Sequence, residues 1–145
     1  MNLDKYNLEA SENNICFYFI SIGRKGRIKK LIKFQAMNKP NYFNLSFGDI
    51  IANDKIDDNR ITDNGDSQKV LATVAYAVIK FTDINPDARI VIVPISLART
   101  RLYRIGISNN LYEINKEFTL LGLLNNKWEG FEPGRDYKAF LAKRK

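Results

Sequence analysis

Four side chains between residues 99 and 104 have the chemistry of an anion-binding or acid–base site. They are Arg99, Arg101, Tyr103 and Arg104, and no acidic residue lies near them in the sequence. A guanidinium binds a carboxylate or a phosphate through a planar pair of donors, and a phenol can donate a proton. On a helix, residues four apart are neighbours, so Arg99 and Tyr103 can act on one anionic group. We predict Tyr103 and Arg99 as catalytic residues and the other two as anion- or substrate-binding residues.

Two interpretations of this arginine cluster remain open. The arginines either pair with the acidic stretch Asp49–Asp66 and only stabilise the fold, or they bind a ligand or RNA. Ala98, Leu102 and Ile105 recur at helical spacing, so we expect them to face the core. The Arg99/Tyr103 flank of the helix is then expected to belong to a functional surface.

A second candidate anion site precedes the predicted helix Ser67–Phe81. The free N–H groups of a first helical turn after a glycine can hold an anion, and Asn64, Gly65 and Lys69 are its candidate residues. Asp66 opposes this use, because a carboxylate that caps the helix occupies those N–H groups and repels phosphate. We therefore predict Asp66 as a structural N-cap.

The elements that must position these residues form a helix–strand–helix unit. The first helix has an apolar stripe at helical spacing, with Lys69, Thr73, Tyr76 and Lys80 on its opposite side. Ile90–Val93 is apolar at successive positions, which is typical of a strand buried on both faces. We expect it in the middle of a sheet, covered by helices Ser67–Phe81 and Leu97–Ile105.

Strands are predicted on both sides of this unit. Glycines between Ile15–Ile22 and Arg27–Gln35 indicate a hairpin, and Asn125-Asn126 indicates another between Phe118–Leu124 and Lys127–Phe131. Tyr42–Gly48 alternates as a third strand. We further expect an acidic surface loop at 49–63 and, at 111–117, a segment of antiparallel character that leads into the strand from Phe118. A short last element is expected at 137–141, followed by a frayed basic end at 142–145. The prediction is a single α/β (α+β) domain, 1–145, with a central mixed sheet flanked by helices.

Composition excludes several classes of function. The chain has 145 residues, 45% of them hydrophobic, and no histidine, which excludes Ser/His and Cys/His catalysis and most zinc sites. A single cysteine, Cys16, forms no disulfide framework and suits a cytoplasmic setting. Apolar runs are too short for a membrane span, which needs ~20 residues. We expect no metal, no cofactor and no membrane association.

The net charge of +7 is unevenly distributed. Basic residues without acids occupy the stretch from Arg24 to Lys39, and alternation puts Arg27, Lys29 and Lys33 on one strand face. This face is either simply solvated or contacts phosphate groups. A basic surface of this kind suits nucleic acid, a phosphorylated ligand or an acidic protein partner.

The order of the predicted elements resembles that of the GNAT acyltransferase fold. Segment 96–107 (SLARTRLYRIGI) is similar to that family's fourth-helix motif, with Leu102-Tyr103 and Gly106-Ile107 in its characteristic positions. The resemblance implies that Tyr103 acts as general acid towards the coenzyme A thiolate. The family's glycine-rich pyrophosphate loop is replaced by residues 64–69 (NGDSQK), which contain an added acid. We predict that coenzyme A is not the ligand.

The whole chain also resembles an uncharacterised family of small bacterial proteins. The segments that carry this resemblance are Phe17–Phe34, Asp63–Val74 and Ala98–Ile107. Small basic bacterial proteins include many toxins of toxin–antitoxin or defence modules, which acidic antitoxin proteins neutralise. Our first expectation is therefore a toxin-like protein acting on RNA or another anionic target. The alternatives are a non-enzymatic nucleic-acid or acidic-protein binding module and a GNAT-type acyltransferase, so enzymatic activity stays open.

Overall fold

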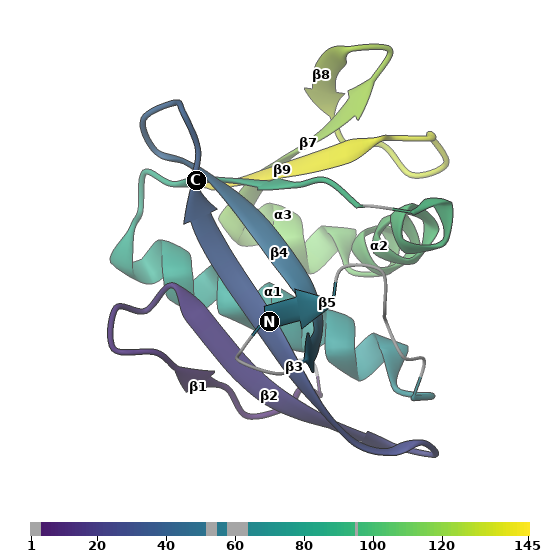
Figure 1. Cartoon of the computed structure of the whole chain (residues 1–145). Coiled ribbons are helices and arrows are strands. Elements are labelled where there is room, and N and C mark those ends of the chain that lie inside the picture. The colour runs from purple at the N-terminus through teal and green to yellow at the C-terminus, as the bar shows by residue number, and fades with distance from the viewer. Residues whose placement is uncertain (1–3, 52–54, 58–63, 95) are drawn as a thin grey trace.

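The protein has a single-domain α+β fold, seen in a computed structural model that describes residues 4–51, 55–57, 64–94 and 96–145 (Figure 1). A nine-stranded sheet has the order β1-β2-β3-β4-β6-β9-β7-β8, with β5 paired to β4. Among the strand pairs of the described residues, only β4–β6 is parallel. The strands are β1 (Glu9–Ala10), β2 (Cys16–Gly23), β3 (Gly26–Ala36), β4 (Tyr42–Ile51), β5 (Lys55–Asp57), β6 (Arg89–Ile92), β7 (Phe118–Leu124), β8 (Lys127–Gly130) and β9 (Ala139–Arg144). The helices are α1 (Ser67–Ile84), α2 (Leu97–Asn109) and α3 (Leu111–Glu117).

Both predicted hairpins are confirmed. β2 and β3 pair up to Gly23 and Gly26, which leaves two residues in the loop, and Gly26 has a φ of 90°. In the β7–β8 hairpin, Asn125 and Asn126 both have positive φ, as a tight turn between twisted strands requires. These turns are local features, which explains why the sequence could predict them.

The predicted central strand is also confirmed. β6 lies between β4 and β9, and its residues Ile90 and Val91 are 0% and 6% exposed. Val93, however, follows the strand and is 55% exposed, so the prediction that it belongs to the buried run is wrong.

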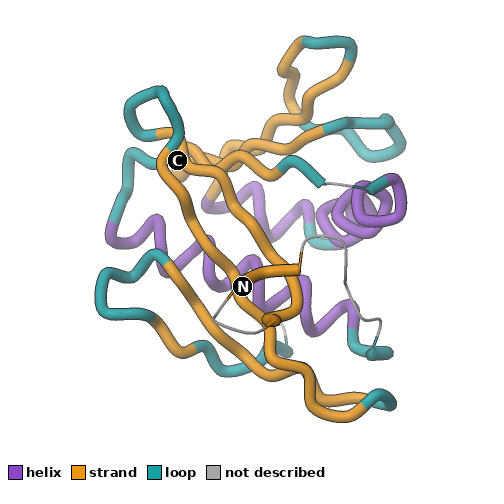
Figure 2. Tube along the Cα trace, in the orientation of Figure 1, coloured by secondary structure: helices purple, strands orange, loops and turns teal. Residues whose placement is uncertain are grey.

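All three helices lie on one face of the strongly bent sheet, which we call the helix-covered face (Figure 2). The strand residues that point to it include Phe34, Phe47 and Ile90, which pack against α1 in one core cluster. α1 is buried around much of its circumference: Thr73, predicted on its polar side, is 0% exposed and accepts a hydrogen bond from the Tyr6 amide at 2.9 Å. None of the three helices is long and apolar enough to cross a membrane, within the part of the chain that the structure describes.

Three predictions for individual segments are wrong. Residues 111–117 form helix α3, and Asp49–Ile51 continues strand β4, with Asp49 buried. Positions 52–54 and 58–63 of the predicted loop lie outside the described residues. Ala142–Arg144 is no frayed end, because it belongs to β9 between β6 and β7. Arg144 ties this strand to α1 through hydrogen bonds to Thr82 Oγ1 and the Ile79 carbonyl, both at 3.0 Å.

Candidate functional site

Helix α2 turns a different face to the core from the one predicted. Its buried residues are Tyr103 and Gly106, whereas Ala98 is exposed and Ile105 is 46% exposed. Gly106 explains the rotation: a Cβ atom there would lie 2.6 Å from Leu71 Cδ1 of α1. The absence of a side chain lets the two helices approach at this point, which directs Tyr103 inward.

Tyr103 is a core side chain rather than an open-surface phenol. It is 8% exposed, and its ring centroid lies 6.4 Å from that of Phe140 in a small cluster that also contains Tyr137. Burial raises the pKa of Tyr103 to about 12, against a smaller lowering effect of the Arg99 charge. The phenol therefore keeps its proton at neutral pH.

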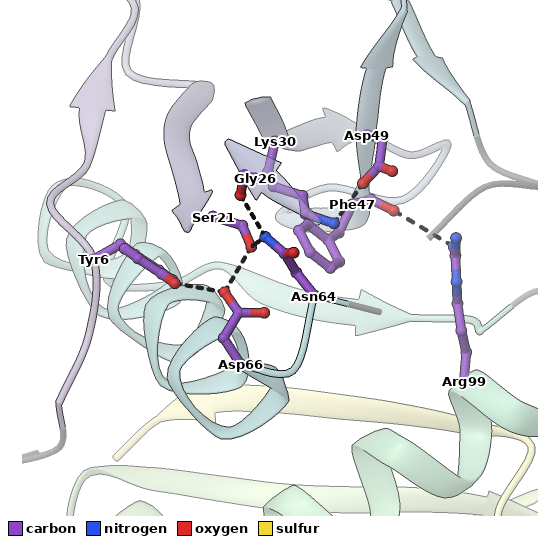
Figure 3. Close-up of polar contacts among 9 residues, drawn as sticks. All are labelled: Tyr6, Ser21, Gly26, Lys30, Phe47, Asp49, Asn64, Asp66 and Arg99. Carbon is purple, nitrogen blue, oxygen red and sulfur yellow. Dashed lines mark hydrogen bonds and ion pairs between the residues drawn. The ribbon is translucent and has the colours of Figure 1, made fainter. Parts of the chain in front are cut away.

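The arginines of α2 point to different partners. Ser96 caps the helix by accepting from the Arg99 amide at 3.2 Å, and Arg99 Nη1 approaches the Phe47 carbonyl at 3.5 Å (Figure 3). Arg104 forms an ion pair with Asp136, before β9, and Arg101 is exposed. The predicted pairing with the acidic stretch is therefore not what holds Arg104. Asp49, an acid of that stretch, pairs with the buried Lys30 at 2.5 Å.

The start of α1 also differs from the prediction. Asp66 occupies the N-cap position, but its side chain makes no capping hydrogen bond. Its Oδ2 accepts from the Tyr6 hydroxyl at 2.5 Å and from the Ser21 hydroxyl at 2.6 Å, as Figure 3 shows. The carboxylate thus ties α1 to β2 and to the N-terminal segment, and the predicted cap is wrong because these hydroxyls compete successfully for it.

Asn64 holds the β2–β3 hairpin. It is 2% exposed, its Oδ1 accepts from the Lys25 amide at 2.6 Å, and its Nδ2 donates to Ser21 Oγ and the Gly26 carbonyl. Gly65 has a φ of 79°, as the predicted tight turn requires. Lys69 lies 3.9 Å from Asp4 and 4.4 Å from the Tyr6 ring centroid. Among the described residues, no hydrogen bond or ion pair joins Asn64 or Lys69 to the α2 cluster, so these predicted site residues lie in two groups.

A more coherent set lies on the sheet face opposite the helices, which we call the helix-free face. Residues paired across strands point to the same side, so the registers assign side chains to each face. Tyr42, Arg89, Lys143 and Thr119 form one row across β4, β6, β9 and β7. The same registers place Tyr18, Lys29 and Lys33 on this face, in β2 and β3. The predicted basic face of β3 is confirmed and extends over neighbouring strands.

Two cations lie over aromatic rings on the helix-free face. Lys29 Nζ is 5.9 Å from the Tyr18 ring centroid, and the Arg89 guanidinium is 5.5 Å from that of Tyr42. Lys29 and Thr119 are exposed, and the tyrosines and the other basic residues named on this face are half-buried. On strands β1–β4 and β6–β9, as far as they are described, Glu9 is the one acid pointing to this side.

Four basic side chains of the helix-free face form no ion pair with a described residue. In the described part of the chain, Lys29, Lys33, Arg89 and Lys143 form no ion pair. Arg89 and Lys143 are direct cross-strand neighbours. Like charges in that position are destabilising, and an anion bound between them would relieve the repulsion.

Comparison with known proteins gives a family but no activity. A family model described as "Family of unknown function (DUF6934)" matches residues 2–145. The chain belongs to the DUF6934 family. The predicted resemblance to an uncharacterised family is thereby confirmed. Searches of curated proteins and of solved structures found no match, and the GNAT resemblance is not confirmed.

Sequence reasoning missed most members of this face in the DUF6934 chain. Tyr18, Tyr42, Arg89 and Lys143 come from four strands spread over 126 positions of the sequence, and only the strand order makes them neighbours. The available signal was the alternation within each strand. It identified Lys29 and Lys33 because, together with Arg27, they fall on the same side of one alternating segment, with Leu31 between them.

Proposed function

We propose that this protein binds single-stranded nucleic acid, RNA in the first instance, on its helix-free face. The observation that carries the proposal is the row of Tyr42, Arg89 and Lys143 across adjacent strands, with the cations free of ion pairs to described residues. A non-enzymatic nucleic-acid binding module was one of the alternatives from the sequence. The arrangement of charges favours this alternative over a catalytic role for Tyr103.

Each component of the face suits one part of a nucleotide. Lysine and arginine neutralise phosphates and release counterions, which makes binding strongly salt-dependent. Tyrosine rings on an exposed sheet can stack on unpaired bases, whereas bases in a duplex are already stacked. The strands from β2 to β9 that carry the face span four inter-strand gaps, or about 19 Å at ~4.8 Å each. That width accommodates a short single-stranded segment.

The toxin-like role expected from the sequence remains a proposal about biological setting. RNA recognition on the helix-free face is compatible with it, but Tyr103 is 8% exposed, so a polynucleotide cannot reach its hydroxyl in this conformation. Growth arrest on expression that persists in Tyr103→Phe and disappears when the helix-free face is neutralised would support toxin-like RNA binding. Arrest that depends on Tyr103 instead would favour a catalytic role.

A charge-matched binding experiment tests the proposal. Fluorescence anisotropy is measured with a labelled single-stranded 12-mer RNA and with its duplex. Arg89→Gln/Lys143→Gln should weaken single-strand binding about tenfold or more and flatten the salt slope by about 1.4, since each single-strand phosphate contact contributes ~0.7. Tyr42→Leu should also weaken binding, because one base–aromatic stack is worth ~1–3 kcal/mol.

The matched control is Lys80→Gln/Lys127→Gln, which removes the same charge outside the helix-free face. It should change affinity no more than about twofold. Equal losses in both double variants would mean that only net charge matters, and the proposed face would be wrong. No binding of RNA, together with binding of an acidic protein through Arg89 and Lys143, would assign the face to a protein partner instead.

A further inference from the structure

A cavity lies between the helices and the sheet. Its volume is about 100 Å³, and side chains from α1, α2, α3, β6, β7 and β9 line it. The lining is almost entirely apolar, with Leu71, Val78, Ile107, Ile114 and Phe140 among its members. An engineered apolar cavity of ~150 Å³ binds benzene, so a space of this order can hold a single small ring.

Small residues keep this space open. Ala72 and Ala75 of α1, Gly106 of α2 and Ala142 of β9 all line it, where larger side chains would fill it. The contact of Gly106 with Leu71 fixes how closely α1 and α2 approach. The cavity therefore has walls that closer packing of the two helices cannot collapse.

One polar side chain that lines the cavity, Tyr103, has no hydrogen-bond partner among the described residues. No described residue forms a hydrogen bond with the Tyr103 hydroxyl, although the side chain is more than nine-tenths buried and lines the cavity. Among the described residues, no fully enclosed side-chain nitrogen or oxygen lacks a partner, so this hydroxyl must reach open space. The hydroxyl is therefore not sealed off, and a molecule that reaches it can serve as its hydrogen-bond partner.

A polar depression on the surface adjoins the cavity. Ala72 and Asn110 line both the cavity and a polar depression at the start of α1. Asn110 Nδ2 donates to the Gly106 carbonyl at 2.8 Å, which holds this side chain at the boundary.

We propose that the cavity is a binding site for a compact, neutral, mainly apolar molecule that carries one hydroxyl, with phenol as its simplest representative. The ring occupies the apolar space, and the ligand hydroxyl forms a hydrogen bond with Tyr103. Because burial raises the pKa of Tyr103, its hydroxyl stays protonated and can both donate and accept. An anionic ligand is disfavoured in so apolar a lining.

The test compares phenol with benzene, which lacks the hydroxyl. Phenol should bind more tightly by calorimetry and should shift amide resonances of residues around the cavity. Tyr103→Phe should reduce phenol affinity about fivefold, the factor expected for one neutral hydrogen bond, and should leave benzene affinity unchanged. Ala75→Leu should abolish binding of both molecules by filling the cavity.

Tyr112→Phe is the matched control, because Tyr112 is 77% exposed and loses the same hydroxyl outside the cavity. It should bind phenol like the parent. The proposal is overturned if phenol leaves the cavity resonances unshifted, or if phenol and benzene bind the parent equally. It is also overturned if Tyr103→Phe weakens both ligands alike, which would make Tyr103 a wall of the cavity only.

Discussion

Replacement of Asp66 by alanine should destabilise the protein by more than the loss of a helix cap. An N-cap substitution costs ~1 kcal/mol. In this structure Asp66 instead accepts hydrogen bonds from the Tyr6 and Ser21 hydroxyls at 2.5 and 2.6 Å. Hydrogen bonds to a charged group contribute about 1.5–3 kcal/mol each. Both hydroxyls keep other contacts, to the Ile22 carbonyl and to Asn64, which lowers the net loss. We expect Asp66→Ala to cost about 2–3 kcal/mol.

Two further variants distinguish these tertiary hydrogen bonds of Asp66 from a helix cap. Asparagine is as good an N-cap as aspartate, but it lacks the charge that both hydroxyls share, so Asp66→Asn should still cost about 1 kcal/mol or more. Tyr6→Phe keeps the ring stacked on Phe19, at a centroid distance of 5.6 Å, and removes only the hydroxyl. A double-mutant cycle of Tyr6→Phe with Asp66→Ala should give a coupling of about 1–2 kcal/mol.

The assay is equilibrium unfolding in urea at neutral pH. Asp87→Ala serves as control, because Asp87 is exposed before β6 and its loss should change stability by less than about 0.5 kcal/mol. Our interpretation would be refuted, and the capping role restored, by three results together. Asp66→Ala would cost ~1 kcal/mol, Asp66→Asn would keep the parent's free energy of unfolding, and the double-mutant cycle would show no coupling to Tyr6.

Two other predictions concern Tyr103 and the β2–β3 hairpin. The pKa of Tyr103 in the folded protein lies at about 12, above the ordinary 10.0. The free energy of unfolding therefore includes the full contribution of the protonated phenol below pH 10, and this contribution is lost as the pH rises from 10 to 12. Unfolding free energies measured across that range should therefore fall about 2–3 kcal/mol less in Tyr103→Phe than in the parent, and parallel curves would contradict this. Gly23→Ala should destabilise the hairpin severely, because the new Cβ atom would lie 1.9 Å from the Asn64 carbonyl oxygen. Gly130→Ala is the control in thermal unfolding, because a Cβ atom added at Gly130 would have no atom within 4 Å apart from its chain neighbours.

The sequence alone determined the elements whose causes are local. The turns at Gly26 and Asn125-Asn126, the alternation of Tyr42–Gly48 and the apolar run at Ile90 each depend on neighbouring residues. For the same reason the basic face of β3 could be predicted: a period of two within one strand assigns Lys29 and Lys33 to one side wherever that strand lies.

Only the tertiary structure decided which residues act together. Tyr6 and Asp66 are 60 positions apart, so no local pattern could show that a tyrosine hydroxyl takes the carboxylate from the helix end. The inward turn of Tyr103 depends on contact between Gly106 and Leu71 of another helix. The row of Tyr42, Arg89 and Lys143 exists because β9 inserts between β6 and β7. The order of the strands depends on the free energy gained by burying apolar surface over the whole core. A single segment contributes too little of this free energy for its sequence to predict the strand order.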